Sequence, residues 1–463
     1  MKRRVFLRDA SQVSLGFLGL SYFATGCKSD PAMGEPVALA EGYGPLLSDP
    51  EGIMNLPEGF SYRIISRLGE TMTDGLLVPG AADGMATFEG RDGKVIIIRN
   101  HELSPTSSSG PFGASNELLG NVTQDQLYDY GHGTMPCQGG TTTMVYNPGT
   151  GLVETQYLSL AGTIRNCAGG PTPWGSWITC EEDTTSGRSE IEKEHGYNFE
   201  VPASATPQLF TPNPLKDMGR FNHEAVCVDP RSGIVYQTED RQDSLIYRFL
   251  PNQPGRLEMG GKLQVLGLKD MASFDTRNWK NLDSDKMEPK KSYQARWIDI
   301  DDVSSPEDDL RLRGFELGGA RFARGEGMWF GENEIYFACT SGGHKGFGQI
   351  FKYIPSEEEG GEGERDNPGT LELFIEPNDT DLIQSADNLT IGKNGHLVIC
   401  EDLKTPRIVG VSPAGEIYHI AKNVGFQSEF AGACFSPNGE ELFVNIQGPG
   451  LTLAIEGPWG KLA

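Results

Sequence analysis

The stretch of sequence that decides the fold runs from residue 166 to residue 183 and reads Asn166-Cys-Ala-Gly-Gly-Pro-Thr-Pro-Trp-Gly-Ser-Trp-Ile-Thr-Cys-Glu-Glu-Asp183. It predicts a β-hairpin, because the prolines and glycines between Pro171 and Gly175 suit a turn and the run Ser176–Cys180 is rich in strand-forming residues. A thiol and three carboxyl groups end the second strand. Like charges gathered at a strand end repel one another unless a cation lies among them. The stretch therefore predicts a hairpin that brings ligands to a cation.

The same pattern recurs along the chain: a short apolar strand, a turn of Gly, Pro or Asn, a second strand, and a polar or acidic end. The six copies are Asp83–Glu102, Asn166–Glu182, Glu224–Asp240, Glu326–Ser341, Asp387–Asp402 and Ala431–Gln447. A third strand follows each copy and a fourth follows most of them, the least clear being Gln208–Phe210 after the second copy. Four-stranded units repeated six times predict an all-β, six-bladed β-propeller. The sixth unit lacks a fourth strand, so Phe60–Ile65 is predicted to complete it and to close the ring.

Three segments depart from the repeat. Residues 252–323 form a long polar insertion, which we expect to decorate one face. Ser356–Asn367 is a low-complexity acidic loop, which we expect to be solvated and mobile. Residues 27–58 are interpreted as a tether and N-terminal extension, which leaves residues 59–463 as a single propeller domain with the insertion inside it.

The N-terminus predicts export. Lys2–Arg8 matches the twin-arginine pattern and precedes the apolar run Val13–Ala24, so residues 1–26 are interpreted as a signal segment for the twin-arginine export machinery. Ala24-Thr-Gly-Cys27 resembles a lipobox without its usual first Leu, and a lipid anchor at Cys27 stays open. We expect a periplasmic or membrane-anchored protein, with the cell surface as a further location.

The formal net charge of −25 makes nucleic acid and anionic membranes poor partners. A solvated acidic surface accounts for most of this charge, and carboxylates gathered for cations account for a part. Besides Cys27 the sequence has seven cysteines, at positions 137, 167, 180, 227, 339, 400 and 434. Cys227, Cys339, Cys400 and Cys434 are interpreted as buried apolar thiols. Cys167 and Cys180 flank the first turn, and both a disulfide and a role as ligands stay open for them.

Strand direction predicts that the acidic residues meet. The start of the first strand and the end of the second lie at the same end of a hairpin, and in a propeller the first strand lines the central channel. The residues at this end, called the mouth here, are Asp83, Cys167, Glu224, Glu326 and Asp387 at strand starts, and Glu102, Cys180, Glu181, Glu239, Asp240, Glu401 and Asp402 at strand ends. Oxygen ligands in such number suit Ca²⁺, and a thiolate among them suits iron or zinc.

Two further residue types lie near the mouth. His101 and His223 are each interpreted as structural when taken alone, yet the tripeptide Asn-His-Glu occurs at both places. Arg324 lies two residues before Glu326. Its side chain could form a structural ion pair, or it could bind phosphate oxygens bidentately beside a cation site.

Several of these pieces together resemble the PhoX family of secreted alkaline phosphatases. They are the twin-arginine leader, Asn100-His-Glu102, Thr172-Pro-Trp-Gly-Ser-Trp-Ile-Thr-Cys-Glu-Glu182, His223-Glu-Ala225 and Arg324-Gly-Glu-Gly327. The resemblance covers most of the chain after the leader, although the family motif is Arg-Pro-Glu-Gly where this chain has Gly325.

The resemblance implies a six-bladed propeller whose mouth holds iron and calcium ions, with a cysteine thiolate bridging the irons. Cys180 matches that thiolate, and Glu102, Glu181, Glu224 and Glu326 match the carboxylates. Arg324 matches the arginine that binds phosphate, and Asp387 and Glu401 join the expected ligands through the strand pattern above. The implied activity is hydrolysis of small-molecule phosphate monoesters.

Two other classes of protein stay open. One is a calcium-dependent propeller hydrolase of the lactonase or phosphotriesterase kind, which would need no iron. The other is an exported propeller without enzymatic activity, in which calcium has a structural role.

Overall fold

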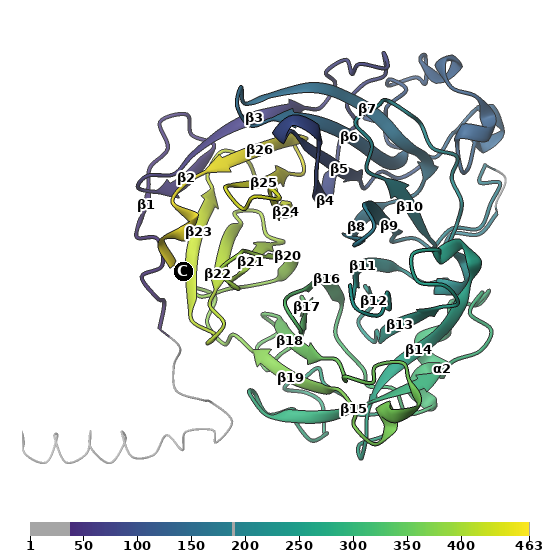
Figure 1. Cartoon of the computed structure of the whole chain (residues 1–463), viewed down its shortest axis with the longest axis vertical. Coiled ribbons are helices and arrows are strands. Elements are labelled where there is room, and N and C mark those ends of the chain that lie inside the picture. Colours follow the sequence, from purple (N-terminus) through teal and green to yellow (C-terminus); the bar gives the residue numbers. More distant parts are fainter. Residues whose placement is uncertain (1–37, 188–189, 463) are drawn as a thin grey trace, which may run out of the picture. The chain divides into compact units, whose positions relative to one another are not determined.

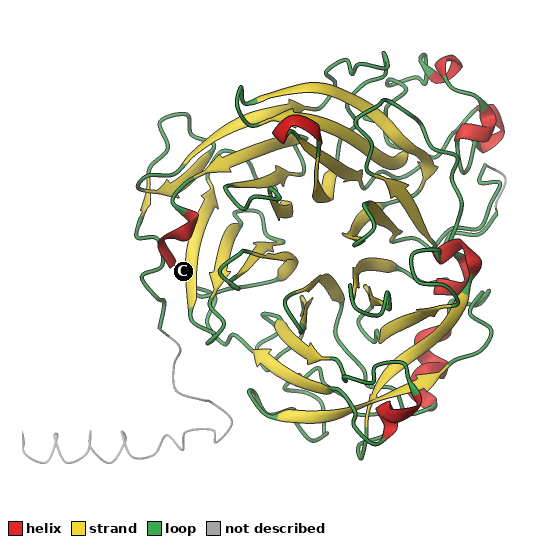
Figure 2. Cartoon of the chain, in the orientation of Figure 1, coloured by secondary structure: helices red, strands yellow, loops and turns green. Residues whose placement is uncertain are grey.

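The structure of the chain, a computed structural model, describes residues 38–187 and 190–462. The predicted leader, Cys27 and the first part of the predicted tether lie outside these residues. Strands dominate the described part, which contains one α-helix, α2 (Leu310–Glu316), and several short 3₁₀ turns (Figure 2). Among the described residues, no helix has the length and apolar character needed to cross a membrane.

Six β-hairpins form the inner part of the fold, as the sequence repeats predict. They are β4 (Ala82–Glu89) with β5 (Val95–His101), β8 (Asn166–Pro171) with β9 (Ser176–Glu181), β11 (His223–Val228) with β12 (Val235–Glu239), β16 (Gly325–Phe330) with β17 (Ile335–Cys339), β20 (Ala386–Ile391) with β21 (Leu397–Glu401), and β24 (Phe430–Phe435) with β25 (Glu441–Ile446). The first strand of each hairpin contacts that of the next, and β24 contacts β4, so the inner strands close a ring (Figure 1). The result is a propeller-like arrangement of antiparallel sheets.

Outer strands extend each hairpin away from the centre. They are β6 (Gly139–Asn147), β7 (Leu152–Thr163), β10 (Asn198–Pro202), β13 (Ile246–Pro251), β14 (Gly261–Leu268), β18 (Gln349–Ile354), β19 (Thr370–Ile375), β22 (Arg407–Val411), β23 (Ile417–Asn423) and β26 (Leu451–Glu456). The last sheet is completed by β3 (Ser61–Arg67), which pairs antiparallel with β26. The prediction that an early strand closes the ring is therefore confirmed.

The prediction that every unit has four strands is wrong for the second unit. Its sheet has the order β10-β9-β8, and residues 208–210 form no strand. Prolines lie on both sides of this segment, at Pro207, Pro212 and Pro214, and they cannot donate the hydrogen bonds of a sheet.

Two sheets are larger than predicted. Part of the expected N-terminal extension forms β1 (Leu46–Leu47) and β2 (Met54–Pro57), which add to β23. Within the insertion, β15 (Ser292–Asp299) pairs with β14 on one side and β19 on the other. The third and fourth units therefore share one nine-stranded sheet, and the insertion is more than decoration of one face.

The acidic loop at 356–367 is held in place, contrary to the expectation of a mobile loop. Glu359 and Glu364 both pair with Arg248, whose side chain is 1% exposed. Glu359 also accepts hydrogen bonds from the hydroxyl groups of Tyr236 and Tyr353. A buried guanidinium requires such partners, because an unpaired buried charge is strongly unfavourable.

Apolar side chains fill the spaces between neighbouring sheets. Between the first and second units, Ile98, Trp177 and Phe199 are fully buried in one cluster. Burying a side chain of this size stabilises the folded chain by about 1.5–3 kcal/mol. The polar end of Trp177 donates from Nε1 to Asn100 Oδ1 over 2.8 Å, so the tryptophan motif also fixes the first hairpin against the second.

Candidate metal centre at the mouth of the ring

All six hairpins have the same irregularity at the mouth. In each, the pairing of the two strands shifts by an extra residue within the first residues of the first strand, as between Ala82 and Met85 or between Gly325 and Met328. Such β-bulges redirect a side chain out of the regular alternation. In five hairpins the first residue of the bulge is the strand-start residue of the sequence prediction: Asp83, Cys167, Glu224, Glu326 and Asp387. In the sixth hairpin Ala431 pairs with Asn445, and the bulge begins one residue later, at Gly432.

A backbone hydrogen bond closes every hairpin on the mouth side. Its donors are the N–H groups of Glu102, Glu182, Asp240, Thr340, Asp402 and Gln447, and each acceptor is the carbonyl of the residue one position before the first strand. In four hairpins that residue is not glycine and yet has a left-handed backbone, with φ of 44° to 54° at Ala81, Arg165, Arg324 and Ser385. Such conformations persist where the surroundings enforce them, and they are concentrated at functional sites. The strand-end side chains Glu102, Glu182, Asp240 and Asp402 therefore lie at the mouth.

Glu181 and Glu401 lie one position earlier and do not belong to the mouth, contrary to prediction. Glu181 accepts hydrogen bonds from the backbone N–H groups of Ile164 and Gly196 and from Nδ1 of His195. Glu401 binds Arg407 through both oxygens, at 2.8 and 2.6 Å. Both carboxylates are fully buried within their own units and hold loops there.

The sequence prediction also placed the thiol of Cys180 among the ligands of the mouth, and the structure does not. Its side chain is 0% exposed and packs in an apolar cluster with Phe221 and Val226. The thiol that joins the carboxylates is that of Cys167, at the bulge of the same hairpin. All seven described cysteines are free and buried, so no disulfide joins Cys167 to Cys180.

The structure gathers two groups of side chains whose ligand atoms lie within 4.8 Å of one another. The first group is Cys167, Glu182 and Glu224, and the second is Glu224, Glu326 and Asp387. Glu224 is common to both, so two cations bound there would be neighbours. The first group offers a thiolate, which suits a transition metal such as iron, whereas the second offers only oxygen, which suits Ca²⁺. The donor sets therefore fit the two kinds of cation that the resemblance implies.

Without a bound cation, the surroundings of the mouth disfavour the ionised form of its carboxyl groups. Burial raises the pKa of Glu224 well above its usual range, and the charges of Glu182 and Asp387 raise it further. Burial, with the charges of Asp240 and Asp387, does the same to the pKa of Glu326. Burial also raises the pKa of the Cys167 thiol. A bound divalent cation reverses this balance, because it favours the deprotonated form of every ligand.

Removal of cations should therefore make the protein less stable as the pH rises. Burial raises the pKa of Glu182 from 4.5 to about 8. A carboxyl group with a higher pKa in the folded chain than in the unfolded chain keeps its proton only when folded, so the free energy of unfolding falls through that window. The slope is about 1.4 kcal/mol per pH unit for each such group. We expect chelator-treated protein to melt at a lower temperature at about pH 8.5 than at about pH 6.5.

The comparison lies above the window of His101 and His223, since burial lowers their pKa and their contribution is nearly complete above their unfolded pKa. The third buried histidine, His195, has a pKa that, against the effect of burial, the charge of Glu181 raises, so it adds to the loss of stability over the same window. Protein saturated with Ca²⁺ and iron is the control and should show little change over the window. A chelated protein that becomes more stable towards pH 8.5 would contradict the raised pKa values of the mouth.

Arg324 lies beside the second group, that of Glu224, Glu326 and Asp387. Its guanidinium donates to both oxygens of Asp240, at 2.8 and 2.9 Å, and Nη2 lies 3.1 Å from Glu326 Oε1. Nη1 forms no hydrogen bond to any described residue, and the side chain is 33% exposed. Two carboxylates thus fix the guanidinium while its outer N–H groups stay available to a ligand.

Arg165 is a second arginine at the mouth, and the sequence interpretation missed it. It has the same backbone position in the second hairpin that Arg324 has in the fourth, and its Nη2 pairs with Glu102 Oε1 at 2.6 Å and with Glu182. The signal was present in the sequence, since each arginine precedes its strand-start ligand by two residues. Glu182 and Glu429 were likewise absent from the residues expected at the mouth, whereas Asp402 was among them; the raised pKa of Glu429 reflects burial and the charges of Asp387 and Asp83.

His101 and His223 have structural roles, as expected of each residue alone. His101 bonds Gly80 O and Thr142 Oγ1, both at 2.9 Å, whereas His223 bonds Gly219 O and stacks on Phe221. The two Asn-His-Glu tripeptides occupy different places, one at a strand end and the other at a strand start. Only their glutamates, Glu102 and Glu224, both lie at the mouth.

Fold and site together define a propeller-like β protein whose mouth gathers buried carboxyl groups and one thiol. Residues 41–450 match the family model described as Alkaline phosphatase PhoX. The chain belongs to this PhoX family.

Solved structures similar to this chain include Pseudomonas fluorescens PhoX in complex with vanadate, a transition state analogue. That match has 16% identity and a TM-score of 0.63, and it covers 91% of this chain and 97% of the other. A putative gluconolactonase has 10% identity, a TM-score of 0.42 and coverage of 89% and 97%. A gluconolactonase from Xanthomonas campestris has 11% identity, a TM-score of 0.40 and coverage of 90% and 98%. No curated protein matches the sequence.

Proposed function

We propose that the protein is a metal-dependent phosphatase that hydrolyses phosphate monoesters of small organic molecules at the mouth of the ring. The observation that carries the proposal is the position of Arg324, fixed by Asp240 and Glu326 at the edge of two potential cation sites that share Glu224. Membership of the alkaline phosphatase PhoX family supports it, as does the likeness to a PhoX structure with a transition state analogue.

The cations of the proposal are iron and calcium. Cys167, Glu182 and Glu224 would hold iron, and Glu224, Glu326 and Asp387 would hold calcium. When bound, such cations neutralise charge on the transferring phosphoryl group and make a water molecule more acidic.

The side chains of the chain itself have three tasks in this proposal. The Nη1 group of Arg324 donates to phosphate oxygens, and Asp240 holds the plane of the guanidinium in a fixed orientation for this contact. Arg165, held by Glu102 and Glu182, places a second positive charge beside the thiolate group. Because a positioned donor needs no reorganisation during the reaction, it favours the transition state more than a mobile one does.

An activity panel with metal analysis tests the proposal. We expect full-length protein supplied with iron and Ca²⁺ to release phosphate from an aryl phosphate monoester, and to lose this activity on chelation. Hydrolysis of only lactones or phosphotriesters, with calcium but no iron bound, would favour the calcium-dependent hydrolase instead. Calcium binding without activity on any of these substrates would favour a non-enzymatic exported protein.

A matched pair of cysteine variants tests the thiolate. Cys167→Ser should lower the iron content of the purified protein by about 10-fold or more, because it removes the soft ligand of the first group. Cys180→Ser, in the same hairpin but outside both groups of ligand atoms, should leave the iron content unchanged. Elemental analysis per mole of protein gives the comparison. The reverse order of effects would return the role to Cys180.

The proposal extends to three points of architecture and location. We count the ring as six blades, with the shared nine-stranded sheet as two, because the six inner hairpins have the same bulge and the same closing hydrogen bond. The twin-arginine sequence supports export, and Cys27 is the residue at which a lipid anchor would be attached. A periplasmic or surface location would give the enzyme access to external phosphate esters.

A further inference from the structure

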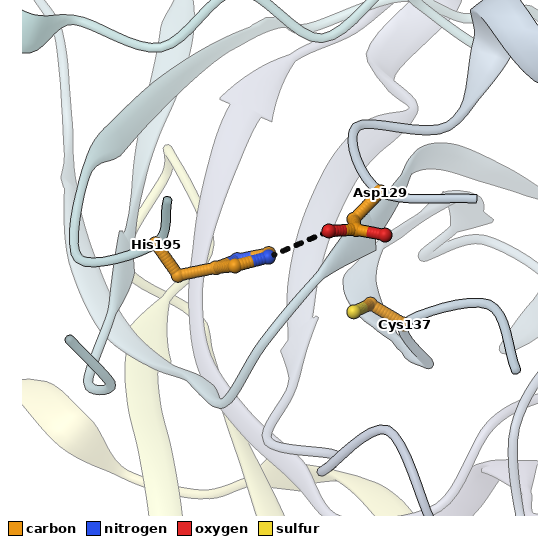
Figure 3. Close-up of side chains that lie close together, drawn as sticks. All are labelled: Asp129, Cys137 and His195. Carbon is orange, nitrogen blue, oxygen red and sulfur yellow. Dashed lines mark hydrogen bonds and ion pairs between the residues drawn. The ribbon is translucent and has the colours of Figure 1, made fainter. Parts of the chain in front are cut away.

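A third group of metal-binding side chains lies away from the mouth. It consists of Asp129, Cys137 and His195, whose ligand atoms lie within 4.8 Å of one another (Figure 3). Asp129 and Cys137 belong to the loop between β5 and β6, and His195 belongs to the loop between β9 and β10. All three side chains are fully buried. The group thus joins two long loops that have no sheet hydrogen bonds to each other.

The two nitrogens of His195 have unequal partners. Nδ1 lies 2.6 Å from Glu181 Oε1, as expected for a charge-assisted hydrogen bond, whereas Nε2 lies 3.4 Å from Asp129 Oδ2. Glu181 therefore fixes the imidazole through Nδ1, and Nε2, whose contact with Asp129 is longer, faces the other two ligand groups. Histidines that bind metals typically have this arrangement, with the far nitrogen held by a carboxylate.

The spacing between His195 and Asp129 leaves room for a metal ion beside them. Zn²⁺ binds nitrogen at about 2.0–2.1 Å and carboxylate oxygen at about 2.0–2.2 Å, so two such ligands at a tetrahedral angle lie about 3.4 Å apart. Nε2 of His195 and Oδ2 of Asp129 are 3.4 Å apart. A direct hydrogen bond of full strength would bring them about 0.5 Å closer.

Backbone N–H groups fix the orientation of the Asp129 carboxylate. Asp129 Oδ1 accepts a hydrogen bond from Gly131 N, and Oδ2 accepts from the N–H groups of Glu192 and Lys193 at 2.8 Å each. A carboxylate offers about four lone pairs, and these three bonds leave one of them, on Oδ1, for a metal ion. Cys137 is tied to the same residue, since its N–H donates to the carbonyl oxygen of Asp129 over 3.2 Å.

We propose that Asp129, Cys137 and His195 supply three of the four ligands of a divalent metal ion of the zinc type, with Glu181 as the residue that orients His195. A metal ion there would replace the thiol proton of Cys137 and a proton on His195, so the net charge of the buried group would not change. The site would fasten both loops to the end of β9, where the next residue is Glu182 of the mouth. The inference rests on this geometry and holds whether or not the protein is a phosphatase.

Cobalt spectroscopy in a Cys167→Ser background tests the site, because that background removes the thiol of the mouth. We expect full-length protein produced with Co²⁺ to bind it with the near-ultraviolet thiolate-to-cobalt absorption and the visible bands of a tetrahedral ion. Adding Cys137→Ser should abolish the thiolate band, whereas adding Cys434→Ser, a buried thiol elsewhere, should leave it. Absence of the band in the Cys167→Ser protein, or its persistence after Cys137→Ser, would overturn the proposal.

A second measurement decides the matter if Cys137→Ser fails to fold. X-ray absorption of zinc in the Cys167→Ser protein should show one sulfur neighbour at about 2.3 Å. His195→Gln, which can still donate to Glu181, should lower the zinc content and the melting temperature while far-ultraviolet circular dichroism stays native. Zinc surrounded by oxygen and nitrogen alone would reject a site at Cys137.

Discussion

Glu224→Gln should lower kcat/KM for an aryl phosphate by at least about 10³-fold and reduce both iron and calcium in the purified protein. The residue belongs to both groups of the mouth, so one substitution removes a ligand from each. Loss of a residue that merely supports a metal ligand costs about 10–100-fold, and a shared ligand should cost more. Glutamine keeps the volume of the side chain and accepts hydrogen bonds, which limits the change to charge and metal affinity.

Glu441→Gln is the matched control for this variant. Glu441 is also a buried carboxyl group in an inner hairpin, but it lies at the start of β25, away from the mouth, and accepts a hydrogen bond from the Tyr146 hydroxyl at 2.6 Å. Its variant should keep kinetics and metal content. A Glu224→Gln protein with unchanged iron and calcium would show that the mouth does not hold them in the proposed way.

Arg324→Ala should lower kcat/KM by about 10²–10³-fold while iron stays bound. The variant should raise KM and lower kcat together, because the guanidinium would contact the phosphate in the bound substrate and more tightly in the transition state. Arg324→Lys should recover only a part, since an ammonium cannot bind Asp240 and a phosphate with a planar fork. Steady-state kinetics with an aryl phosphate, together with metal analysis, separates this result from the ligand loss of Glu224→Gln.

Arg407→Lys provides the control for the arginine. Arg407 also binds a carboxylate bidentately, that of Glu401, but it belongs to β22 and to the buried part of its unit. We expect lower thermal stability and unchanged kcat/KM. Unchanged turnover in Arg324→Ala would remove the residue from the proposed reaction.

Strand direction was enough to predict the ring and the residues at the strand starts. The period of the hairpins fixed which residues lie at one end, and Asp83, Glu224, Glu326 and Asp387 are there. The strand ends were harder because two acidic residues follow one another in three hairpins. In Glu181-Glu182 the first residue is the last one paired in the sheet, and its side chain turns into the unit. Only the second extends past the pairing to the mouth.

The choice of thiol failed for a related reason. Resemblance favoured Cys180, which stands in the most specific motif, but this residue pairs with Asn198 inside the sheet. Cys167 lies at a bulge, which no residue pattern in a single hairpin reveals. Comparing all six strand starts would have favoured it, since Cys167 stands where the other hairpins have Asp83 and Glu224.

Long-range partners explain the remaining differences. The acidic loop at 356–367 looked disordered by composition, yet buried Arg248, more than a hundred residues earlier, binds it. The position of β15 between two units depends on strands on either side of it that are far apart in sequence. Neither pairing leaves a local pattern.

The bulge found in every hairpin sets the direction of a side chain through the backbone and not through the side chain itself. Because backbone hydrogen bonds alone set where each strand start projects, the chain can exchange one side chain there for another and keep its shape. In the proposed metal sites, the difference between a soft and a hard donor set thus comes from a single residue, Cys167 in place of a carboxylate. Ala431, Thr340 and Gln447 are the three positions of this frame that have neither an acidic side chain nor a thiol. They are the positions at which a substitution would introduce a further ligand when the metal preference of the protein is redesigned.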